Sequence, residues 1–257
     1  MPSTLEEMDG GRHFERVDWH PNRTRPPELS AWPFTIPCVT QIIADGGFDL
    51  PAGVTFLVGE NGSGKSTLIE ALAASYPRHG HWASWGNTVG PDGSQEDSEL
   101  HWHLRAKRAH MGSPAGFFLR AEAMHAWFAG LDENPNEQRP WGGTRLNARS
   151  HGESFLEVLR QRFADIGVYF LDEPEAALSF RSSLGLVALL DTLRSEGSQV
   201  IVATHSPLVA SLPGATLLEL GDWGLRQVDR YDDLDLVASW RSYLDAPERY
   251  LRHLLTD

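Results

Sequence analysis

Short apolar runs alternate with helical patterns along most of this chain of 257 residues. Runs without polar alternation, typical of strands buried on both faces of a parallel sheet, cover residues 54–58, 166–171 and 200–203. Apolar positions with helical spacing cover residues 66–75, 154–163 and 175–194. Strands that alternate with helices predict an α/β fold, a doubly wound domain with a mostly parallel core sheet flanked by helices.

Further elements are predicted around this core. A β-branched, apolar run indicates a strand at residues 38–43, and an alternating pattern indicates another at residues 100–105. Residues 117–129 predict a helix, or a strand that runs into one. The turn Gly221–Gly224 separates two apolar runs and predicts a hairpin between residues 216–220 and 225–228. A last helix, interrupted near Pro247, is expected over residues 234–255.

We expect a single domain over residues 1–257, with three segments that depart from the core pattern. Residues 1–36 are rich in proline and predict an irregular lead-in with at most one short strand. Residues 77–150 predict an inserted helical and irregular subdomain with mobile loops between the two halves of the core. Residues 234–257 form the predicted C-terminal helical segment.

Composition narrows the class of protein. Twenty-two basic against 35 acidic side chains give a net charge of −13, so neither nucleic acid nor an anionic membrane is an expected partner. No run approaches the roughly 18 apolar residues of a membrane-spanning helix, and the acidic N-terminus lacks the apolar core of a signal sequence. Cys38 is the only cysteine, which excludes an internal disulfide. We therefore expect a cytoplasmic protein.

A glycine-rich motif lies between the first buried strand and the helix that follows. It fits G-x-x-x-x-G-K-[ST], and its residues are Gly59, Glu60, Asn61, Gly62, Ser63, Gly64, Lys65 and Ser66, followed by Thr67. Glycines let backbone N–H groups approach a phosphate closely, and the helix N-terminus adds partial positive charge. Lys65 is expected to reach the β- and γ-phosphates, and the Ser66 hydroxyl to bind Mg²⁺. The flanking strand and helix favour a P-loop nucleotide site over a glycine-rich turn with a chance lysine.

Two adjacent carboxylates end the second buried run. If this strand lies beside the P-loop strand, Asp172 can hold Mg²⁺ and Glu173 can orient or deprotonate the attacking water. The alternative is that both residues only cap the helix that begins after Pro174. The presence of a P-loop in the same chain favours the role in ATP hydrolysis.

On these motifs the chain resembles the ABC-type ATPases, a superfamily of P-loop NTPases, from about residue 37 to 220. Glu60-Asn61, Asp172-Glu-Pro174 and Thr204-His205-Ser206 are all in the style of that family. The resemblance implies ATP and Mg²⁺ as cofactors, with Asp172 as the Walker B residue. It also implies that His205 is the switch histidine that contacts the γ-phosphate, whereas His205 alone would be interpreted as a hydrogen-bonded strand-end residue.

A signature-like sequence precedes the predicted helix at residues 154–163. Ser150-His-Gly-Glu153 is similar to the family's Ser-Gly-Gly-Gln, and its spacing from Asp172 agrees with the family pattern. In the family, ATP is sandwiched between one P-loop and the partner's signature, which implies nucleotide contacts for Ser150, Gly152 and Glu153. We therefore expect a homodimer that forms on ATP binding and drives an unidentified protein partner.

Several positions depart from the family pattern. Glu153 in place of glutamine is similar to the chromosome-maintenance and RecF-like branches. Ser179 stands at the D-loop position of the family's aspartate, and Glu122 is a candidate replacement for a missing Q-loop glutamine. Trp32 and Phe34 are candidates for stacking on adenine, although core packing is favoured for both.

The main interpretation is a stand-alone ABC-type ATPase, similar to predicted bacterial ATPases of the RecF and overcoming-lysogenisation (OLD) groups. One alternative is the nucleotide-binding subunit of a transporter, which the unusual insertion at residues 77–150 disfavours. Another is a DNA-repair or chromosome-associated ATPase, which the acidic charge disfavours; Glu173 argues against a non-hydrolysing ATP sensor. The histidine pairs at residues 79 and 81 and at 101 and 103 are interpreted as polar loop and strand residues rather than metal ligands.

Overall fold

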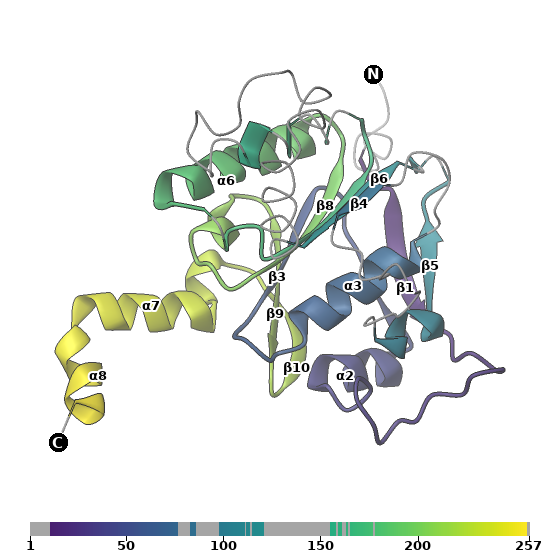
Figure 1. Ribbon diagram of the computed structural model, residues 1–257, viewed down its shortest axis with the longest axis horizontal. Coiled ribbons are helices and arrows are strands. Elements are labelled where there is room, and N and C mark those ends of the chain that lie inside the picture. The colour runs from purple at the N-terminus through teal and green to yellow at the C-terminus, as the bar shows by residue number, and fades with distance from the viewer. Residues whose placement is uncertain are drawn as a thin grey trace, which may run out of the picture.

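In the part of the chain that the structure describes, a sheet of seven strands runs through the centre of the molecule, in the order β10-β9-β3-β8-β7-β6-β4 (Figure 1). This computed structural model describes residues 11–76, 83–85, 98–110, 112–113, 115–120, 155–157, 159–160, 163, 165–176 and 178–255. The strands are β3 (Val54–Val58), β4 (Ala83–Trp85), β6 (Gly116–Arg120), β7 (Val168–Asp172), β8 (Gln199–Thr204), β9 (Thr216–Gly221) and β10 (Gly224–Val228). All neighbouring strands are parallel except the β9–β10 hairpin at one edge. The predicted mostly parallel core sheet is confirmed.

Alternate residues of the central strands face two separate hydrophobic cores. On β8, Val202 lies in the core that includes α6 (Phe180–Ser195), whereas Ile201 lies in the core that includes α3 (Lys65–Ser75). Figure 1 shows these two helices on opposite sides of the sheet. Because both faces are covered, the strands contain almost only apolar residues, which explains their uninterrupted hydrophobic runs.

A second, antiparallel sheet has the order β2-β1-β5 and lies beside α3 (Figure 1). Its strands are β1 (Phe14–Trp19), β2 (Gly47–Asp49) and β5 (Leu104–Arg108). Gln199, the first residue of β8, joins the two sheets: its Oε1 accepts from the N–H groups of His13 (2.9 Å) and Phe14 (2.7 Å). Its Nε2 donates to the carbonyl groups of Phe14 (2.9 Å) and Pro51 (2.8 Å).

The strand predicted at residues 38–43 is a helix, α2 (Pro37–Asp45), and that prediction is wrong. Pro37 occupies the first helical turn, and Gly46 ends the helix in the left-handed conformation, with φ 71°. Both residues are typical of helix ends. The β-branched side chains of this segment suggested a strand, but these end signals decide its structure.

Three other predicted boundaries differ from the structure. Residues 100–105 are mostly the 3₁₀-helix η1 (Glu99–His103), and the strand there begins only at Leu104. β4 lies within a stretch expected to be a loop. α6 begins at Phe180 rather than near residue 175, because residues 174–176 form a turn and Ser179 caps the helix.

The other predicted elements are present where the structure describes them. The hairpin has a two-residue turn between Gly221 and Gly224. Residues 155–157 and 159–160 are helical. The short 3₁₀-helices are η4 (Val209–Ser211) and η5 (Tyr231–Asp233).

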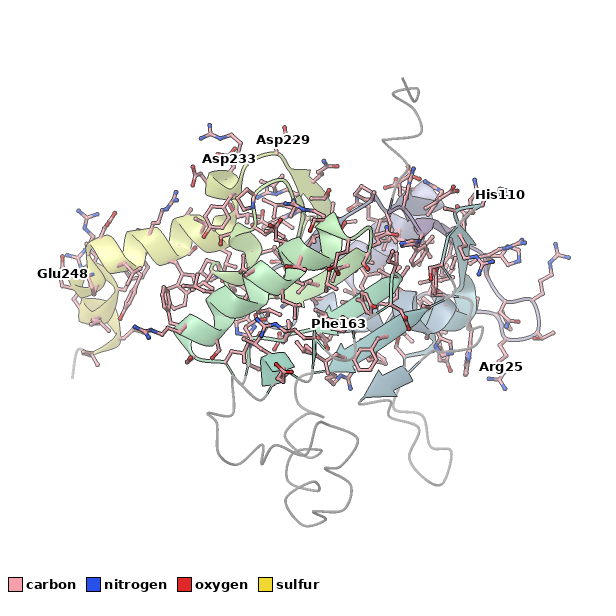
Figure 2. The ribbon with its side chains drawn as sticks, turned by 90° about the horizontal axis from the view of Figure 1, so that it is seen from above. Arg25, His110, Phe163, Asp229, Asp233 and Glu248 are labelled. Atoms are coloured by element: carbon pink, nitrogen blue, oxygen red, sulfur yellow. The ribbon has the colours of Figure 1, made fainter. Side chains whose placement is uncertain are left out.

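The C-terminal helices α7 (Asp235–Asp245) and α8 (Pro247–Leu254) break at Pro247 as expected and extend away from the sheets (Figure 1). In Figure 2, Glu248 of α8 lies at the opposite end of the molecule from Arg25 and His110. Among the described helices, none is long and apolar enough to cross a membrane.

Candidate active site

The glycine-rich loop joins the end of β3 to the start of α3. Gly62 and Gly64 have φ values of 86° and 94°, a conformation that favours glycine. A Cβ atom on Gly64 would also lie 2.5 Å from the Ile36 side chain, so no larger residue fits. The loop therefore leaves open backbone at the N-terminus of α3, as a phosphate-binding loop requires.

Lys65 begins α3 and turns its ammonium group back over this loop. Only 3% of its surface is exposed, and its Nζ donates to the carbonyl oxygen of Glu60 at 2.8 Å. The nearest carboxylate oxygen, Glu173 Oε1, lies 3.9 Å from Nζ. Burial lowers the pKa of Lys65, and the nearby charges of Glu173 and Asp172 oppose that shift.

Ser66, in the first turn of α3, meets Asp172 at the end of β7: the Ser66 hydroxyl donates to Asp172 Oδ1 at 3.0 Å. β7, which ends in Asp172, does not lie beside the P-loop strand as expected, because β8 lies between them. The two groups still meet because the carboxyl ends of parallel strands share one edge of the sheet. Burial raises the pKa of Asp172 to about 6, although the Ser66 hydrogen bond and the positive charge of Arg120 act in the opposite direction.

Glu173 has an unusual backbone. With φ 48°, it is the only non-glycine residue with a positive φ in the described ranges, and its N–H donates to the Ala203 carbonyl at 2.9 Å. A left-handed conformation costs about 1–2 kcal/mol in a residue with a Cβ atom. The carboxylate of this residue lies in the site: Glu173 Oε1 is near Lys65 Nζ and 3.2 Å from His205 Nδ1.

His205 follows β8, at the edge where β7 also ends. Its Nδ1 faces Glu173 Oε1 at 3.2 Å without hydrogen-bond geometry. Its backbone N–H donates to Glu175 Oε1 at 3.2 Å, and the Thr204 hydroxyl donates to the same oxygen. The structure therefore brings Lys65, Glu173 and His205 together in one cluster.

Sequence reasoning missed Glu175. This carboxylate is buried, and burial raises its pKa. Its Oε2 has no hydrogen-bond partner among the described residues. The only available signal was its position two residues after Glu173, which does not distinguish it from a residue on a solvated turn.

Arg120 was also missed as a site residue. It ends β6 in register with Asp172 on β7, with its Nε 3.6 Å from Asp172 Oδ2. It also forms an ion pair with Glu70 of α3. Its position at the end of an apolar run, like that of Asp172, was the available signal.

Lys65, Asp172 and Glu173 line one cavity of about 580 Å³, whereas Glu175 and His205 are not among its lining residues. Its lining residues are Trp32, Ile36, Asn61, Gly62, Gly64, Lys65, Ser66, Thr67, Arg120, Asp172, Glu173 and Ala176. Trp32 is 61% exposed at this cavity, whereas Phe34 is 2% exposed and packs against Trp19 and His103. Core packing is therefore the role of Phe34 and not of Trp32.

Other predicted residues cannot be placed in the cluster. Ser150, Gly152, Glu153 and Glu122 lie outside the described residues, as do the histidines at 79 and 81. Ser179, at the D-loop position, accepts from the Ser182 N–H at 3.3 Å and so caps α6.

The second histidine pair, at residues 101 and 103, differs from its predicted role. His103 is a buried side chain rather than a polar strand residue, and its Nδ1 accepts from the Asn22 N–H at 3.0 Å. No group of three or more histidine, cysteine or acidic residues that could hold a metal ion by themselves occurs in the ranges that the structure describes.

The cavity fits a nucleotide and a divalent cation by the chemistry of its donors. The open backbone of the glycine loop and the Lys65 ammonium are groups that bind phosphate. The Ser66 hydroxyl and the Asp172 carboxylate are oxygen ligands of the kind that Mg²⁺ prefers. Both sets of groups open into the same space.

Comparison with known proteins agrees with this chemistry. A family model described as an AAA domain matches residues 41–99. The chain is 30% identical over 182 residues to the cytochrome c biogenesis ATP-binding export protein CcmA of Rhodospirillum rubrum, covering 66% of this chain and 75% of CcmA. It is 29% identical over 207 residues to the arabinose import ATP-binding protein AraG of Ralstonia nicotianae, covering 70% of this chain and 39% of AraG.

Among solved structures, the SMC head domain from Thermotoga maritima matches with a TM-score of 0.44 and 16% identity, covering 84% of this chain and 98% of that chain. The match to CcmA is the more informative, because it extends over three quarters of that protein. Together with the site on the seven-stranded sheet, it shows that this chain belongs to the ABC-type P-loop ATPases.

Proposed function

We propose that this chain binds ATP in the cavity beside the P-loop and hydrolyses it to ADP and phosphate with Mg²⁺. The observation that carries the proposal is the buried Lys65 ammonium, which faces Glu173 in the cavity that also holds the Ser66–Asp172 pair. A buried ammonium is costly unless a negative group compensates it. Phosphate oxygens supply that charge.

Each group has a proposed role in binding. Lys65 and the backbone of the loop from Gly59 to Gly64 are proposed to hold the phosphates, with Asn61, Gly62 and Gly64 lining the cavity. Ser66 and Asp172 are proposed to hold Mg²⁺. When bound, Mg²⁺ neutralises part of the phosphate charge. Thr67 lines the same cavity near the start of α3 and completes the proposed binding segment.

Glu173 is the proposed general base. Its carboxylate accepts a proton from water, the water oxygen bonds to the terminal phosphorus, and the bond from that phosphorus to the ADP oxygen breaks. The strained backbone of Glu173 and its bond to Ala203 fix the carboxylate relative to β8. His205, whose Nδ1 lies 3.2 Å from Glu173 Oε1, is the proposed contact to the terminal phosphate.

The substitution Glu173→Gln tests this role. We expect phosphate release to fall at least about 100-fold while ATP affinity changes little, because the amide keeps the shape and loses the base. Glu196→Gln, at an exposed position after α6, is the matched control. A Glu173→Gln protein that releases phosphate at the normal rate would refute the role of Glu173.

Trp32 is the proposed platform for the adenine ring, because it is the exposed aromatic residue at the cavity. Stacking of a base on an aromatic side chain contributes about 1–3 kcal/mol. Trp32→Ala should therefore weaken ATP binding at least about fivefold. Its affinity for inorganic tripolyphosphate, which has no base, should be unchanged; an equal loss for both ligands would exclude stacking.

We further propose that ATP closes a head-to-tail homodimer, with Ser150, Gly152 and Glu153 of one copy completing the site of the other. The support is the signature-like sequence together with membership of the family. Light scattering of Glu173→Gln protein should show a monomer without nucleotide and a dimer with Mg²⁺ and ATP. A monomer under both conditions, with ATP bound, would rule out this arrangement.

A second candidate function is the ATP-binding subunit of a transport system. The names of CcmA and AraG, an export and an import protein, favour it. If it holds, a membrane protein should co-purify with the tagged chain from detergent extracts and stimulate its ATPase activity. Capture only of non-membrane partners would favour the stand-alone ATPase.

A further inference from the structure

Arg120 is a second cation in the proposed nucleotide cavity, and no motif accounts for it. It ends β6, next to the strand that supplies Asp172, and its side chain is 22% exposed. Its guanidinium lies between two carboxylates from different elements, Glu70 of α3 and Asp172 of β7. Lys65 and Ser66 line the same cavity.

The two oxygens of Asp172 have different neighbours. Oδ1 accepts the hydrogen bond from Ser66, whereas Oδ2 faces Arg120 Nε at 3.6 Å. The guanidinium therefore lies on the side of Asp172 that the proposed metal ligand Ser66 does not occupy. Positive charge from Arg120 and from a metal ion would act on the same carboxylate.

The balance of charge makes Arg120 important for an anionic ligand. Among the described residues, two cations, Lys65 and Arg120, form ion pairs with the carboxylates of Glu70, Asp172 and Glu173. Without Arg120, Lys65 would be the one described cation paired with this group when the phosphates enter. Low local exposure weakens solvent screening and strengthens these effects.

We propose that Arg120 is a further nucleotide-binding residue, whose guanidinium compensates Asp172 before Mg²⁺ binds and supplies positive charge to the phosphates when Mg²⁺ occupies that carboxylate. This inference rests on the proposed ATP-binding function. Glu70 holds the guanidinium in place through its ion pair with Arg120. The planar fork of arginine can contact two acidic groups at once, which lysine cannot do as well.

A purely structural role is the competing explanation. In that case Arg120 would only join β6 to α3 through Glu70, and its loss would lower stability without affecting the response to metal. The two explanations differ in one measurable quantity, the dependence of ATP affinity on Mg²⁺.

The test is calorimetric titration of ATP into wild type, Arg120→Ala and Arg120→Lys, in EDTA and in Mg²⁺. In EDTA, Arg120→Ala should bind ATP at least about tenfold more weakly than wild type, which corresponds to about 1.4 kcal/mol. In Mg²⁺ the loss should be smaller, because the metal then neutralises Asp172 in the variant, where Arg120 no longer competes with it for that carboxylate. The ATP affinity of Arg120→Lys should lie between those of wild type and Arg120→Ala, since lysine keeps the charge and lacks the planar fork of the guanidinium.

Controls separate this inference from folding and from the proposed function. Arg230→Ala, at an exposed arginine paired with Asp232, should bind ATP like wild type under both conditions. Thermal unfolding of each variant shows whether it is folded, and Arg120→Gln replaces Arg120→Ala if the latter is not. An equal loss of affinity with and without Mg²⁺, or no loss, overturns the role of Arg120. Failure of wild type to bind ATP would instead overturn the proposed function.

Discussion

The two ends of strand β8 differ in how well their buried polar groups are hydrogen-bonded. At the amino end, the neutral amide of Gln199 makes four hydrogen bonds to the backbone of His13, Phe14 and Pro51. At the carboxyl end, Thr204 and His205 meet a group of carboxylates. Around it, Glu175 Oε2 and His205 Nδ1 lack hydrogen-bond partners among the described residues.

This difference separates a structural network from a functional one. A buried polar group that is fully paired stabilises the fold, and one left unpaired costs free energy. The carboxyl end also contains a buried lysine and a strained glutamate. Such costs are retained where a ligand completes the interactions.

The largest expected effect belongs to the carboxyl end. Lys65→Ala should lower phosphate release about 1000-fold, the upper range for loss of one transition-state donor. Its free energy of unfolding should stay the same or rise, because a costly buried ammonium is removed. Phosphate release and urea denaturation are the measurements, with Lys107→Ala as control, since Lys107 is the only other lysine and is exposed. A large fall in the free energy of unfolding of Lys65→Ala would contradict the view that the groups at the carboxyl end of β8 do not serve stability.

Gln199→Ala should show the opposite pattern. Loss of its four hydrogen bonds leaves buried backbone groups unpaired and should lower the free energy of unfolding by about 3 kcal/mol. ATP turnover per folded molecule should stay within about twofold of wild type, because the amide lies at the far end of the strand from His205. Gln227→Ala, at an exposed position on β10, is the control. If turnover per folded molecule falls by much more than twofold, Gln199 affects the site, and the two ends of β8 do not act independently.

Glu175→Gln should have a smaller effect on turnover, about fivefold, because a neutral acceptor holds the Thr204 hydroxyl and the His205 N–H less firmly than a carboxylate does. Burial raises the pKa of Glu175, so the folded state favours its protonated form and loses stability as the pH rises. The stability of Glu175→Gln relative to wild type should therefore increase from pH 5 to pH 8. Urea denaturation at several pH values measures this trend, and a gain at low pH only would contradict it.

The smallest effect is expected at His103, a buried side chain that is only partly hydrogen-bonded. Its Nδ1 is paired with the Asn22 N–H, and its Nε2 has no partner among the described residues. Burial lowers the pKa of His103 below 6.5, although the charge of Glu99 opposes the shift. The stability that this histidine contributes is present above pH 6.5 and should be lost as the pH falls from there. His103→Asn should flatten that part of the curve of unfolding free energy against pH, which urea denaturation at several pH values measures.

The sequence predicted the strands whose ends form the candidate site. The buried runs ending at Val58, Asp172 and Thr204 are strands of one sheet, and their ends lie together. The glycine-rich motif fixed the P-loop, because few loops can place backbone, helix terminus and lysine in that order. The order of the strands, with β8 between β3 and β7, could not be read from motifs, because pairing depends on contacts between distant segments.

Local patterns misled in two kinds of place. In α2, β-branched residues suggested a strand. The end signals at Pro37 and Gly46 favour a helix instead, and so does the packing of one helix face on the core that includes α3. Glu175 and Arg120 carry no distinctive motif, and each gains its environment from residues far away in sequence. The same is true of Trp32 and Phe34, which are near neighbours in the chain with opposite exposure.

By itself, the sequence determined which chemical groups the candidate site contains: a glycine-rich loop followed by a lysine, an acidic pair and a histidine after a strand, each encoded by residues close together in the chain. The tertiary structure alone decided which charges share a cavity, such as Arg120 and Asp172, and it alone decided that Glu175 is buried. The physical reason is that a motif records local backbone geometry, whereas burial and charge balance depend on the folding of distant segments around one edge of the sheet.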